Sequence, residues 1–340
     1  MAIIECLLPA KNILVYDVAA SASGALSVLN DFYNEVKEHE DKSIKWTFVV
    51  SKPHLEDTEN IKIVRIPWVK KSWIHRLFCD HFIAPKLINK NNIDKVFSLQ
   101  NVLVPLTNVT QILYLHQSLP FAEYRFKITE NFHLWIYQNV ISRLIFSGIK
   151  KAEKTIVQAN WMKVACKEKI GVNEDKIIVI PPVINIVPEK FFSYKNMPIT
   201  MFIYPATPQV YKNHKIIIEA CKLLIEDGIK DFQVIFTLTG KENKLSRQLR
   251  QQTEKYGLPI KFIGSIEREK LYDWYSKAIL ILPSYIESFP LPLLEAKINK
   301  APILVSNSAF SHEILDGCEN VKFFNPTKEI ELKKIMLLFF

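Results

Sequence analysis

The sequence alternates short, continuous apolar runs with helical patterns. In the first half, the apolar runs predict strands at 12–16, 46–50, 61–66, 95–99, 111–115, 155–158 and 177–180, with helices at 25–39, 73–89, 131–146 and 161–170. Continuous apolar strands separated by helices are typical of a parallel sheet that is covered on both faces. We therefore expect a doubly wound α/β domain in residues 1–182.

A proline-rich stretch interrupts this alternation. Pro181-Pro182, followed by Pro188 and Pro198, has no clear hydrophobic period, which is typical of an interdomain linker. The alternation then restarts, with strands predicted at 200–204, 232–238, 261–263, 278–282 and 303–305 and helices at 213–226, 245–256, 268–277 and 293–298. A second doubly wound domain is therefore expected in residues 183–340.

Composition excludes several classes of protein. The 340 residues are 49% hydrophobic, enough for two separate cores. Five cysteines lie far apart without a Cys-x-x-Cys pair, so we expect neither a disulfide framework nor a zinc site. The first ten residues lack the basic and apolar regions of a signal peptide, and no run approaches the ~18 apolar residues of a membrane-spanning helix. We expect a cytoplasmic protein.

Two glutamates, Glu287 and Glu295, lie eight residues apart around the start of a predicted helix. The strand predicted at 278–282 ends before them, so they flank a strand-to-helix turn. Such turns lie at the carboxyl edge of a parallel sheet, where ligands bind and a helix amino terminus attracts anions. The two carboxylates could accept hydrogen bonds from hydroxyl groups on two parts of a ligand, with a phosphate held between them. This arrangement suits a nucleotide sugar. The spacing alone also recurs by chance.

The residues around the two glutamates add specificity. The strand end Leu282-Pro283-Ser284, the Glu-Ser-Phe-Pro-Leu-Pro turn and the Leu-Leu-Glu-Ala helix start resemble the E-x7-E signature of retaining glycosyltransferases of family 4. That family has the GT-B fold, in which two Rossmann-like doubly wound domains face a cleft. The similarity extends over about 200–326, in the order Tyr204-Pro205-Ala206, Lys212-Asn213, Gly240, Phe262-Ile263-Gly264, Leu271 with Tyr275, and the glutamate frame.

The resemblance implies that a nucleotide-sugar donor binds the carboxyl-terminal domain. Glu295 would hold the ribose hydroxyls, Glu287 the sugar hydroxyls and Lys212 the diphosphate. The turn Phe289-Pro290-Leu291 would bind the donor, and the backbone N–H groups of Phe289 and Leu291 would meet the sugar diphosphate. Gly240 follows a predicted strand, where the sheet edge would meet the donor.

Two residues of the amino-terminal domain complete the candidate site. His116 follows the strand at 111–115, which would place it at the carboxyl edge of the first sheet, opposite Glu287. Gly24 lies between the first strand and the first helix, where it would let the loop approach a sugar or phosphate closely. A lone histidine is more often structural, and an ordinary turn explains Gly24 equally well.

The sequence departs from the family pattern at three points. Pro290 stands where many relatives have glycine, which removes one N–H group. The arginine that often precedes the lysine is absent, with Thr207-Pro208-Gln209 in its neighbourhood. The sequence given ends at Phe340, where we expect the last helix, which usually crosses back to the first domain, not to have been reached.

We predict retaining transfer of a sugar from a nucleoside diphosphate to a glycan or lipid-linked acceptor, in the synthesis of cell-surface polysaccharide or lipopolysaccharide. Because the sequence has no Asp-x-Asp triplet and no His/Cys metal spacing, we expect a metal-independent reaction with no cofactor besides the donor. Two alternatives stay open: a GT-B sugar-nucleotide epimerase or phosphorylase, and an inactive protein that only binds glycan or nucleotide.

A basic segment predicts a further partner. Residues 61–90 hold seven Lys and Arg side chains and one acidic side chain, and in 66–78 tryptophans and aliphatic residues interleave with the bases. Such a segment can bind an anionic membrane surface. The alternative is a solvated basic helix whose aromatic side chains pack inward. No nucleic-acid-binding motif accompanies the charge, so we expect no nucleic-acid partner.

Overall fold

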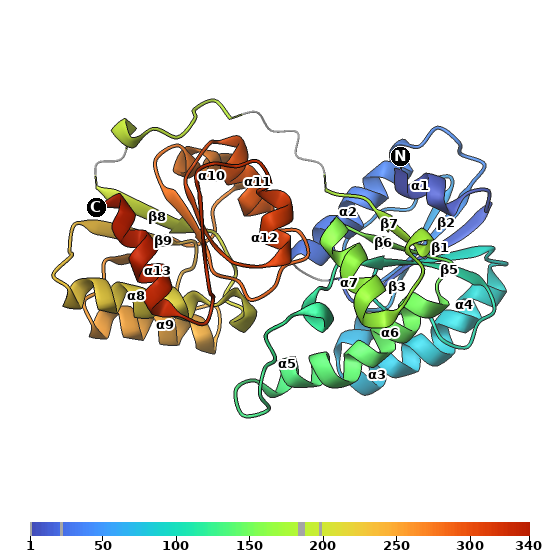
Figure 1. The fold of residues 1–340 in the computed structure, drawn as a ribbon. Helices are drawn as coiled ribbons and strands as arrows, with labels where there is room; N and C mark the ends of the chain where they lie inside the picture. Colours follow the sequence, from blue (N-terminus) through green and yellow to red (C-terminus); the bar gives the residue numbers. More distant parts are fainter. Residues whose placement is uncertain (1, 21–22, 183–187, 197–198) are drawn as a thin grey trace. The chain divides into compact units, whose positions relative to one another are not determined.

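The computed structural model describes residues 2–20, 23–182, 188–196 and 199–340 (Figure 1). The chain divides into two compact units. Unit 1 contains Met1–Phe121 and Arg125–Pro182, and unit 2 contains Ala122–Tyr124 and Val183–Phe340. Both are α/β, as predicted.

Unit 1 is built on a seven-stranded parallel sheet with the order β3-β2-β1-β4-β5-β6-β7. In β1, Ile13 and Val15 enter one hydrophobic cluster while Leu14 and Tyr16 enter another, so both faces of the sheet are buried. This explains why the strand is a continuous apolar run. The strands are β1 (Asn12–Asp17), β2 (Lys45–Val50), β3 (Ile61–Arg65), β4 (Lys95–Ser98), β5 (Thr110–Leu115), β6 (Lys154–Val157) and β7 (Ile177–Val179).

Helices cover both faces of this sheet (Figure 1). The helix predicted at 73–89 is interrupted in its middle by a π-helical turn, η2 (Cys79–Ile83). The helix predicted at 131–146 likewise contains a π-helical turn, η4 (Tyr137–Ile141). The helices are α1 (Ala2–Leu7), α2 (Ser23–Glu38), α3 (Trp73–Phe78), α4 (Ala84–Lys90), α5 (Phe132–Ile136), α6 (Ser142–Lys151) and α7 (Asn160–Ile170).

Unit 2 repeats the architecture with a six-stranded parallel sheet, order β10-β9-β8-β11-β12-β13. Its strands are β8 (Thr200–Tyr204), β9 (Phe232–Phe236), β10 (Ile260–Phe262), β11 (Ile279–Leu282), β12 (Ile303–Ser306) and β13 (Val321–Phe324). Its helices are α8 (His214–Glu226), α9 (Lys244–Lys255), α10 (Arg268–Tyr275), α11 (Leu291–Ile298), α12 (Ala309–Ile314) and α13 (Glu329–Met336). In Figure 1, α8, α9 and α13 lie on one side of the sheet and α10, α11 and α12 on the other.

The last elements of unit 2 were not predicted from the sequence. Strand β13 is at the sheet edge, and only Phe324 of its four residues is buried, so its apolar signal is weak. Lys322 lies in the middle of this edge strand, where a charge discourages pairing with another chain. Helices α12 and α13 are short, at six and eight residues, which gives little room for a helical period.

Strand order reverses once in each sheet, between β1 and β4 in unit 1 and between β8 and β11 in unit 2. Neighbouring strands at such a point send their following loops in opposite directions and leave a crevice at their carboxyl ends. Ligands of doubly wound proteins bind there. Candidate residues that lie near these two points are therefore well placed to contact a ligand.

Candidate functional site

Lys212 and Glu287 meet at the reversal point of unit 2. Lys212 ends the turn η7 (Val210–Lys212) that follows β8, and Glu287 lies on the loop that follows β11. The Lys212 Nζ atom is 2.6 Å from Glu287 Oε1, and the side chains keep exposed fractions of 20% and 11%. A charged pair of this kind, largely withdrawn from water but still accessible, lies where the fold places a ligand.

Buried polar groups hold this pair in place. The Tyr204 hydroxyl donates to the Lys212 carbonyl at 2.7 Å and lies 3.0 Å from Ser284 Oγ. Burial, with a smaller contribution from the Glu287 charge, raises the pKa of Tyr204 well above its usual value, so the hydroxyl keeps its proton. A further bond joins the two loops, because the Tyr285 N–H donates to the Tyr211 carbonyl at 2.9 Å.

Asn213, next to Lys212, also joins the two loops. Its φ of 57° is in the left-handed region, which asparagine tolerates better than most residues. Its Nδ2 atom donates to the carbonyls of Pro283, at 3.2 Å, and Pro326, at 2.7 Å. The backbone on both sides of the Lys212–Glu287 pair is therefore fixed before any ligand arrives.

His214 is a buried neighbour of the pair that the sequence reasoning did not identify. Its ring lies 4.5 Å from that of Tyr204 and 5.2 Å from that of Phe236, centre to centre. Burial lowers its pKa to about 3, and the charge of Lys212 adds to the effect. The imidazole is therefore neutral at physiological pH, and Lys212 is the cationic side chain beside it.

We expect the buried His214 to lower the stability of the folded protein in acid. Because the pKa of His214 is lower in the folded than in the unfolded protein, its stabilisation is complete above about pH 6.5 and is lost as pH falls toward 3. At pH 5 the loss should be about 2 kcal/mol. We expect His214→Phe, which does not titrate, to reduce the fall in unfolding free energy between pH 7.5 and 5.0, measured by urea denaturation. An equal fall in both proteins would contradict the assignment.

Glu295, the second carboxylate of the frame, lies in α11 and is 2% exposed. Arg268 Nε donates to its Oε1 atom at 2.7 Å, and the Tyr275 hydroxyl donates to its Oε2 atom at 3.2 Å. Arg268, the first residue of α10, was not among the residues expected from the sequence. Each carboxylate oxygen can accept a second hydrogen bond, so Glu295 retains capacity for a hydroxyl group.

The turn between the glutamates offers few donors to an anion. Pro290 caps α11, and Pro292 follows in its first turn, so neither position supplies an N–H group. The N–H of Leu293 is donated to the Pro290 carbonyl at 3.0 Å. Within 289–293, the groups that could face a phosphate are therefore those of Phe289 and Leu291, the two expected from the sequence.

Gly240 follows β9 at the same edge of the sheet. Its φ is +77°, and a Cβ atom there would lie 2.7 Å from Arg250 Cδ. Both the backbone angle and the packing therefore require glycine. Arg250 is held there because its NH1 group donates to the Thr239 carbonyl at 3.0 Å. Local structure is thus sufficient to explain the glycine at position 240. Contact between Gly240 and a ligand stays a prediction.

His116 lies just after β5 in unit 1. Asn101, on the loop after β4, donates from Nδ2 to His116 Nε2 at 3.2 Å, and its Oδ1 accepts the N–H groups of His116 and Gln117, both at 2.9 Å. Burial lowers the pKa of His116 to about 4, so the ring is neutral. Since Nε2 accepts, the proton is on Nδ1, and this atom has no partner among the described residues.

Gly24 lies in the first turn of α2, which begins earlier than the helix predicted at 25–39. It is exposed, its φ is not in the left-handed region, and a Cβ atom would meet nothing within 4 Å in the described structure. No local backbone need therefore explains this glycine. Its role in a close approach to a ligand stays a prediction, and its neighbours at 21–22 lie outside the described residues.

Asp17, at the carboxyl end of β1, is a third residue, after His214 and Arg268, that was not predicted from the sequence. Its Oδ1 atom accepts the N–H groups of Ala19 and Ala20, while Oδ2 is buried without a partner among the described residues. Burial raises its pKa to about 6. The signal in the sequence was a single acidic residue that ends an apolar strand.

Within the described ranges, no group of three or more His, Cys, Asp and Glu side chains is arranged to hold a metal ion. Among the same residues, every helix is too short or too polar to cross a bilayer.

Part of the chain is similar to a probable sucrose-phosphate synthase from Thermosipho melanesiensis. The alignment of 155 positions is 31% identical and covers 42% of this chain and 35% of that protein. The matching part thus spans about a third of the relative's length.

The structure also resembles solved structures along nearly its whole length. The sucrose-phosphate synthase of Thermosynechococcus elongatus superposes with a TM-score of 0.69 at 15% identity, over 96% of this chain and 88% of that one. Anabaena Alr3699/HepE, solved in complex with UDP and glucose, gives 0.65 at 15% identity, over 97% and 89%. At this level of identity, the likeness establishes the fold, two Rossmann-like domains of the GT-B type. Residues 187–337, in the carboxyl-terminal unit, match the family described as Glycosyl transferases group 1.

Proposed function

We propose that the protein is a retaining glycosyltransferase that moves a hexose or related sugar from a nucleoside diphosphate to a glycan or lipid-linked acceptor. The observation that carries the proposal is the Lys212–Glu287 pair, which lies at the strand-order reversal of the unit that matches the group 1 family. The complex of HepE with UDP and glucose supports a nucleotide-sugar donor.

In the proposed reaction, Lys212 neutralises the charge of the diphosphate, and Glu287 accepts hydrogen bonds from hydroxyl groups of the sugar. Their ion pair keeps the ammonium group oriented before the donor binds, and the bonds of Tyr204 and Asn213 fix both loops. Charges held in advance where negative charge develops are usually the largest contribution to catalysis. The N–H groups of Phe289 and Leu291 would add to this stabilisation.

Retention follows from front-face displacement. The bond from the anomeric carbon to the phosphate oxygen breaks, and the acceptor oxygen forms its bond on the same face of the sugar. The acceptor proton passes to the departing phosphate oxygen, so no enzymatic nucleophile is required. His116 is proposed to donate a hydrogen bond from Nδ1 to the sugar, in keeping with its neutral ring.

Glu295 is proposed to hold the ribose, with Arg268 keeping its carboxylate aligned. A carboxylate that is 2% exposed would be costly without such a partner. The donor's ribose would then bind an oxygen whose direction is already set. We further propose that the enzyme works in the cytoplasm, at the inner face of the membrane, in the synthesis of cell-surface polysaccharide or lipopolysaccharide.

Nucleotide binding provides the first test of the proposal. Purified protein is heated with UDP, GDP, ADP or CMP, and the melting temperature is compared with that of the protein alone. A nucleotide at 100 times its Kd stabilises the folded state by about 2.7 kcal/mol, so one should raise the melting temperature clearly. The corresponding sugar nucleotide should then be hydrolysed or transferred. No shift with any of the four, at millimolar concentration, would contradict the proposal.

Turnover is expected to be independent of divalent metal. Lys212, with the amino end of α11, would supply the positive charge that Mg²⁺ or Mn²⁺ supplies in other transferases. Rates measured in excess EDTA should therefore equal those in its absence. If activity disappears with the chelator and returns with added Mg²⁺ or Mn²⁺, a metal takes part and the assignment of Lys212 is wrong.

A further inference from the structure

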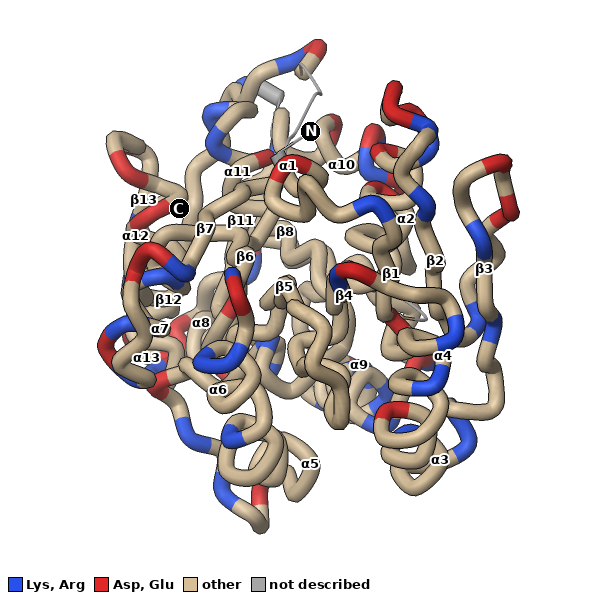
Figure 2. Tube along the Cα trace, turned by 90° about the vertical axis from the view of Figure 1, so that its right-hand side faces the viewer, with Lys and Arg blue, Asp and Glu red and all other residues tan. Residues whose placement is uncertain are grey.

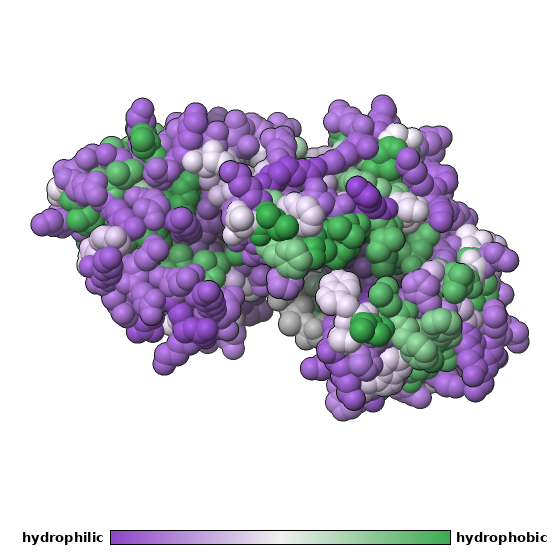
Figure 3. All heavy atoms as spheres, turned by 90° about the horizontal axis from the view of Figure 1, so that it is seen from below, coloured by the Kyte–Doolittle hydropathy of each residue, from purple (hydrophilic) through white to green (hydrophobic). Residues whose placement is uncertain are grey.

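Unit 1 exposes a broad set of apolar side chains on two neighbouring helical segments, α3-η2-α4 and α5-η4-α6. No residue of the described helix α3 is buried, and its Trp73 and Ile74 side chains are 68% and 77% exposed. Figure 3 shows apolar side chains gathered on the face seen from below. We call the following set the apolar face: Trp73, Ile74, Leu77, Phe78, Phe82, Phe132, Val140 and Leu144, all at least half exposed.

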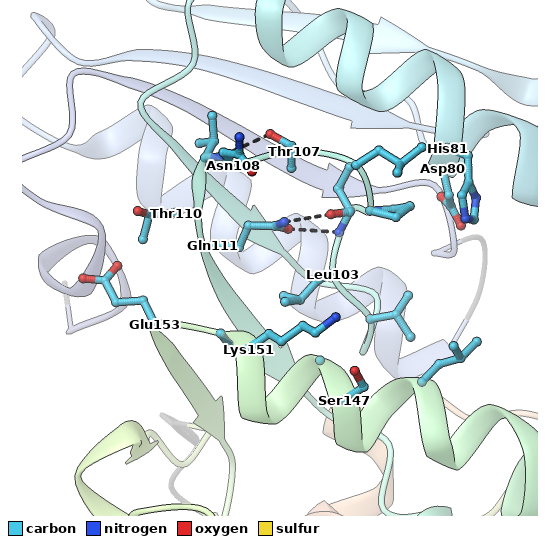
Figure 4. Close-up of a pocket in the computed structure, with 18 of the residues that line it drawn as sticks. Asp80, His81, Leu103, Thr107, Asn108, Thr110, Gln111, Ser147, Lys151 and Glu153 are labelled. Carbon is cyan, nitrogen blue, oxygen red and sulfur yellow. Dashed lines mark hydrogen bonds between the residues drawn. The ribbon is translucent and has the colours of Figure 1, made fainter.

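A groove separates the two segments. The crossover from β4 to β5 consists of residues 99–109 without a helix, although parallel strands are usually joined through one. The loop fills only part of the space and leaves a groove of about 610 Å³, lined by Leu77 on one side and Leu144 on the other. Figure 4 shows Asp80 and His81 on one wall and Ser147 and Lys151 on the other.

Two hydrogen bonds tie the floor of the groove to β5. Gln111 donates from Nε2 to the Val104 carbonyl at 2.7 Å, and its Oε1 accepts the Val104 N–H at 2.9 Å (Figure 4). At the tip of the same loop, Leu106 is exposed and has a φ of 54°, an unfavourable backbone angle for a leucine. The loop that carries the exposed Leu106 is therefore held to the sheet through Gln111.

The two helical segments are predominantly basic. The two helical segments carry Arg76, Lys86, Lys90, Arg143, Lys150 and Lys151 (Figure 2). Residues 132–151 include no Asp or Glu, and Asp80, the one acidic residue in 73–90, is bonded to Arg76 Nε at 2.8 Å and to the Tyr16 hydroxyl at 2.7 Å. Arg76 neutralises Asp80, so the other five basic side chains keep a net positive field beside the apolar residues.

We propose that the apolar face docks on an anionic lipid bilayer. Contiguous exposed apolar side chains mark an interaction surface, and their combination with lysine and arginine suits a membrane interface, where rings and aliphatic chains enter the headgroup boundary and bases meet lipid phosphates. Pairing with a second copy of the same face would bring like charges together, which disfavours a dimer. The docking uses unit 1 alone and does not depend on donor chemistry.

The structure bears on the alternative interpretation of 66–78, a basic helix whose aromatic side chains pack inward, and membrane binding stays a proposal. The aromatic side chain of Trp73 points outward, against the expectation of a helix whose aromatics pack inward. Trp68 is only partly buried, 6.2 Å from Phe78 between ring centres. The docking surface is also larger than the sequence indicated, because α5, η4 and α6 contribute to it.

Vesicle co-sedimentation tests the proposal on the whole protein. Vesicles of phosphatidylcholine with and without phosphatidylglycerol are compared at low and high salt. An apolar variant combines Trp73→Ser with Ile74→Ser, and a charge variant combines Lys86→Glu, Lys90→Glu and Arg143→Glu. Matched controls change exposed residues of unit 2: Ile330→Ser with Leu338→Ser, and Lys261→Glu, Lys322→Glu and Lys334→Glu.

The wild-type protein should bind the anionic vesicles, and salt should weaken the binding. Each face variant should lower the partition coefficient at least tenfold, whereas the controls should stay within about twofold. The nucleotide-induced rise in melting temperature should be unchanged in all variants, which separates this proposal from that of the transferase. The proposal is overturned if wild type fails to sediment at low salt, if the variants bind equally, or if sedimentation equilibrium shows a dimer that the apolar variant dissociates.

Discussion

Replacing Lys212 with methionine is expected to lower turnover by about 10²- to 10³-fold with a smaller effect on nucleotide affinity. Methionine keeps much of the side-chain volume but removes the charge that would stabilise the departing diphosphate, and loss of one such group typically costs ~2.7–4 kcal/mol in the transition state. Initial rates at saturating donor measure the effect. Lys215→Met, an exposed lysine one turn along in α8, is the matched control and should behave as wild type.

The ion pair gives this prediction a second readout. Glu287→Gln should also lower turnover, since a neutral amide would hold the sugar hydroxyls and orient the ammonium group less strongly than the carboxylate does. Because Lys212 Nζ and Glu287 Oε1 are 2.6 Å apart, the double variant should lose less than the sum of the single losses in activation free energy. Full activity of Lys212→Met, or strict additivity in the double variant, would contradict the proposed roles.

Glu295→Ala should weaken nucleotide binding at least tenfold. Loss of a charged hydrogen-bond partner typically costs ~1.5–3 kcal/mol, and here Arg268 and Tyr275 also lose the oxygens to which they donate. Calorimetric titration with the nucleotide that gives the largest thermal shift measures the change. Glu319→Ala, an exposed glutamate of the same unit, is the control.

Arg268→Gln separates two roles of the Glu295 carboxylate. If Arg268 aligns Glu295 for the ribose, Arg268→Gln should reduce nucleotide affinity by a smaller factor than Glu295→Ala while leaving turnover at saturating donor unchanged. Unchanged nucleotide affinity in Glu295→Ala would remove Glu295 from the donor site. Unchanged affinity in Arg268→Gln alone would limit Arg268 to a structural role.

Local sequence was a good guide to the regular elements. Strand β11 and the start of α11 follow from a run of aliphatic residues, a proline and a helical pattern, so the positions of Glu287 and Glu295 could be predicted from neighbours in sequence. The boundaries of β1 and β8 were predicted in the same way, because a strand buried on both faces is continuously apolar. The weak cases were short or peripheral elements, such as α1 and β13, whose few residues carry little periodic signal.

The contacts of the candidate site required the tertiary structure. Lys212 and Glu287 are 75 residues apart, and Arg268 and Glu295 are 27 apart, so no local pattern contains either pair. The neutral state of His214 likewise depends on burial between Tyr204 and Phe236, which the sequence around it does not encode.

The sequence by itself determined the two α/β units and the edge of each sheet where chemistry is expected, because strand and helix periods are local properties of the chain. Only the tertiary structure decided which charges are paired there and which apolar side chains of α3 stay exposed. Trp73 and Ile74 are residue types usually found in cores, yet their side chains are 68% and 77% exposed. Burial depends on what else packs against a residue, and that is fixed by chain segments far away in sequence.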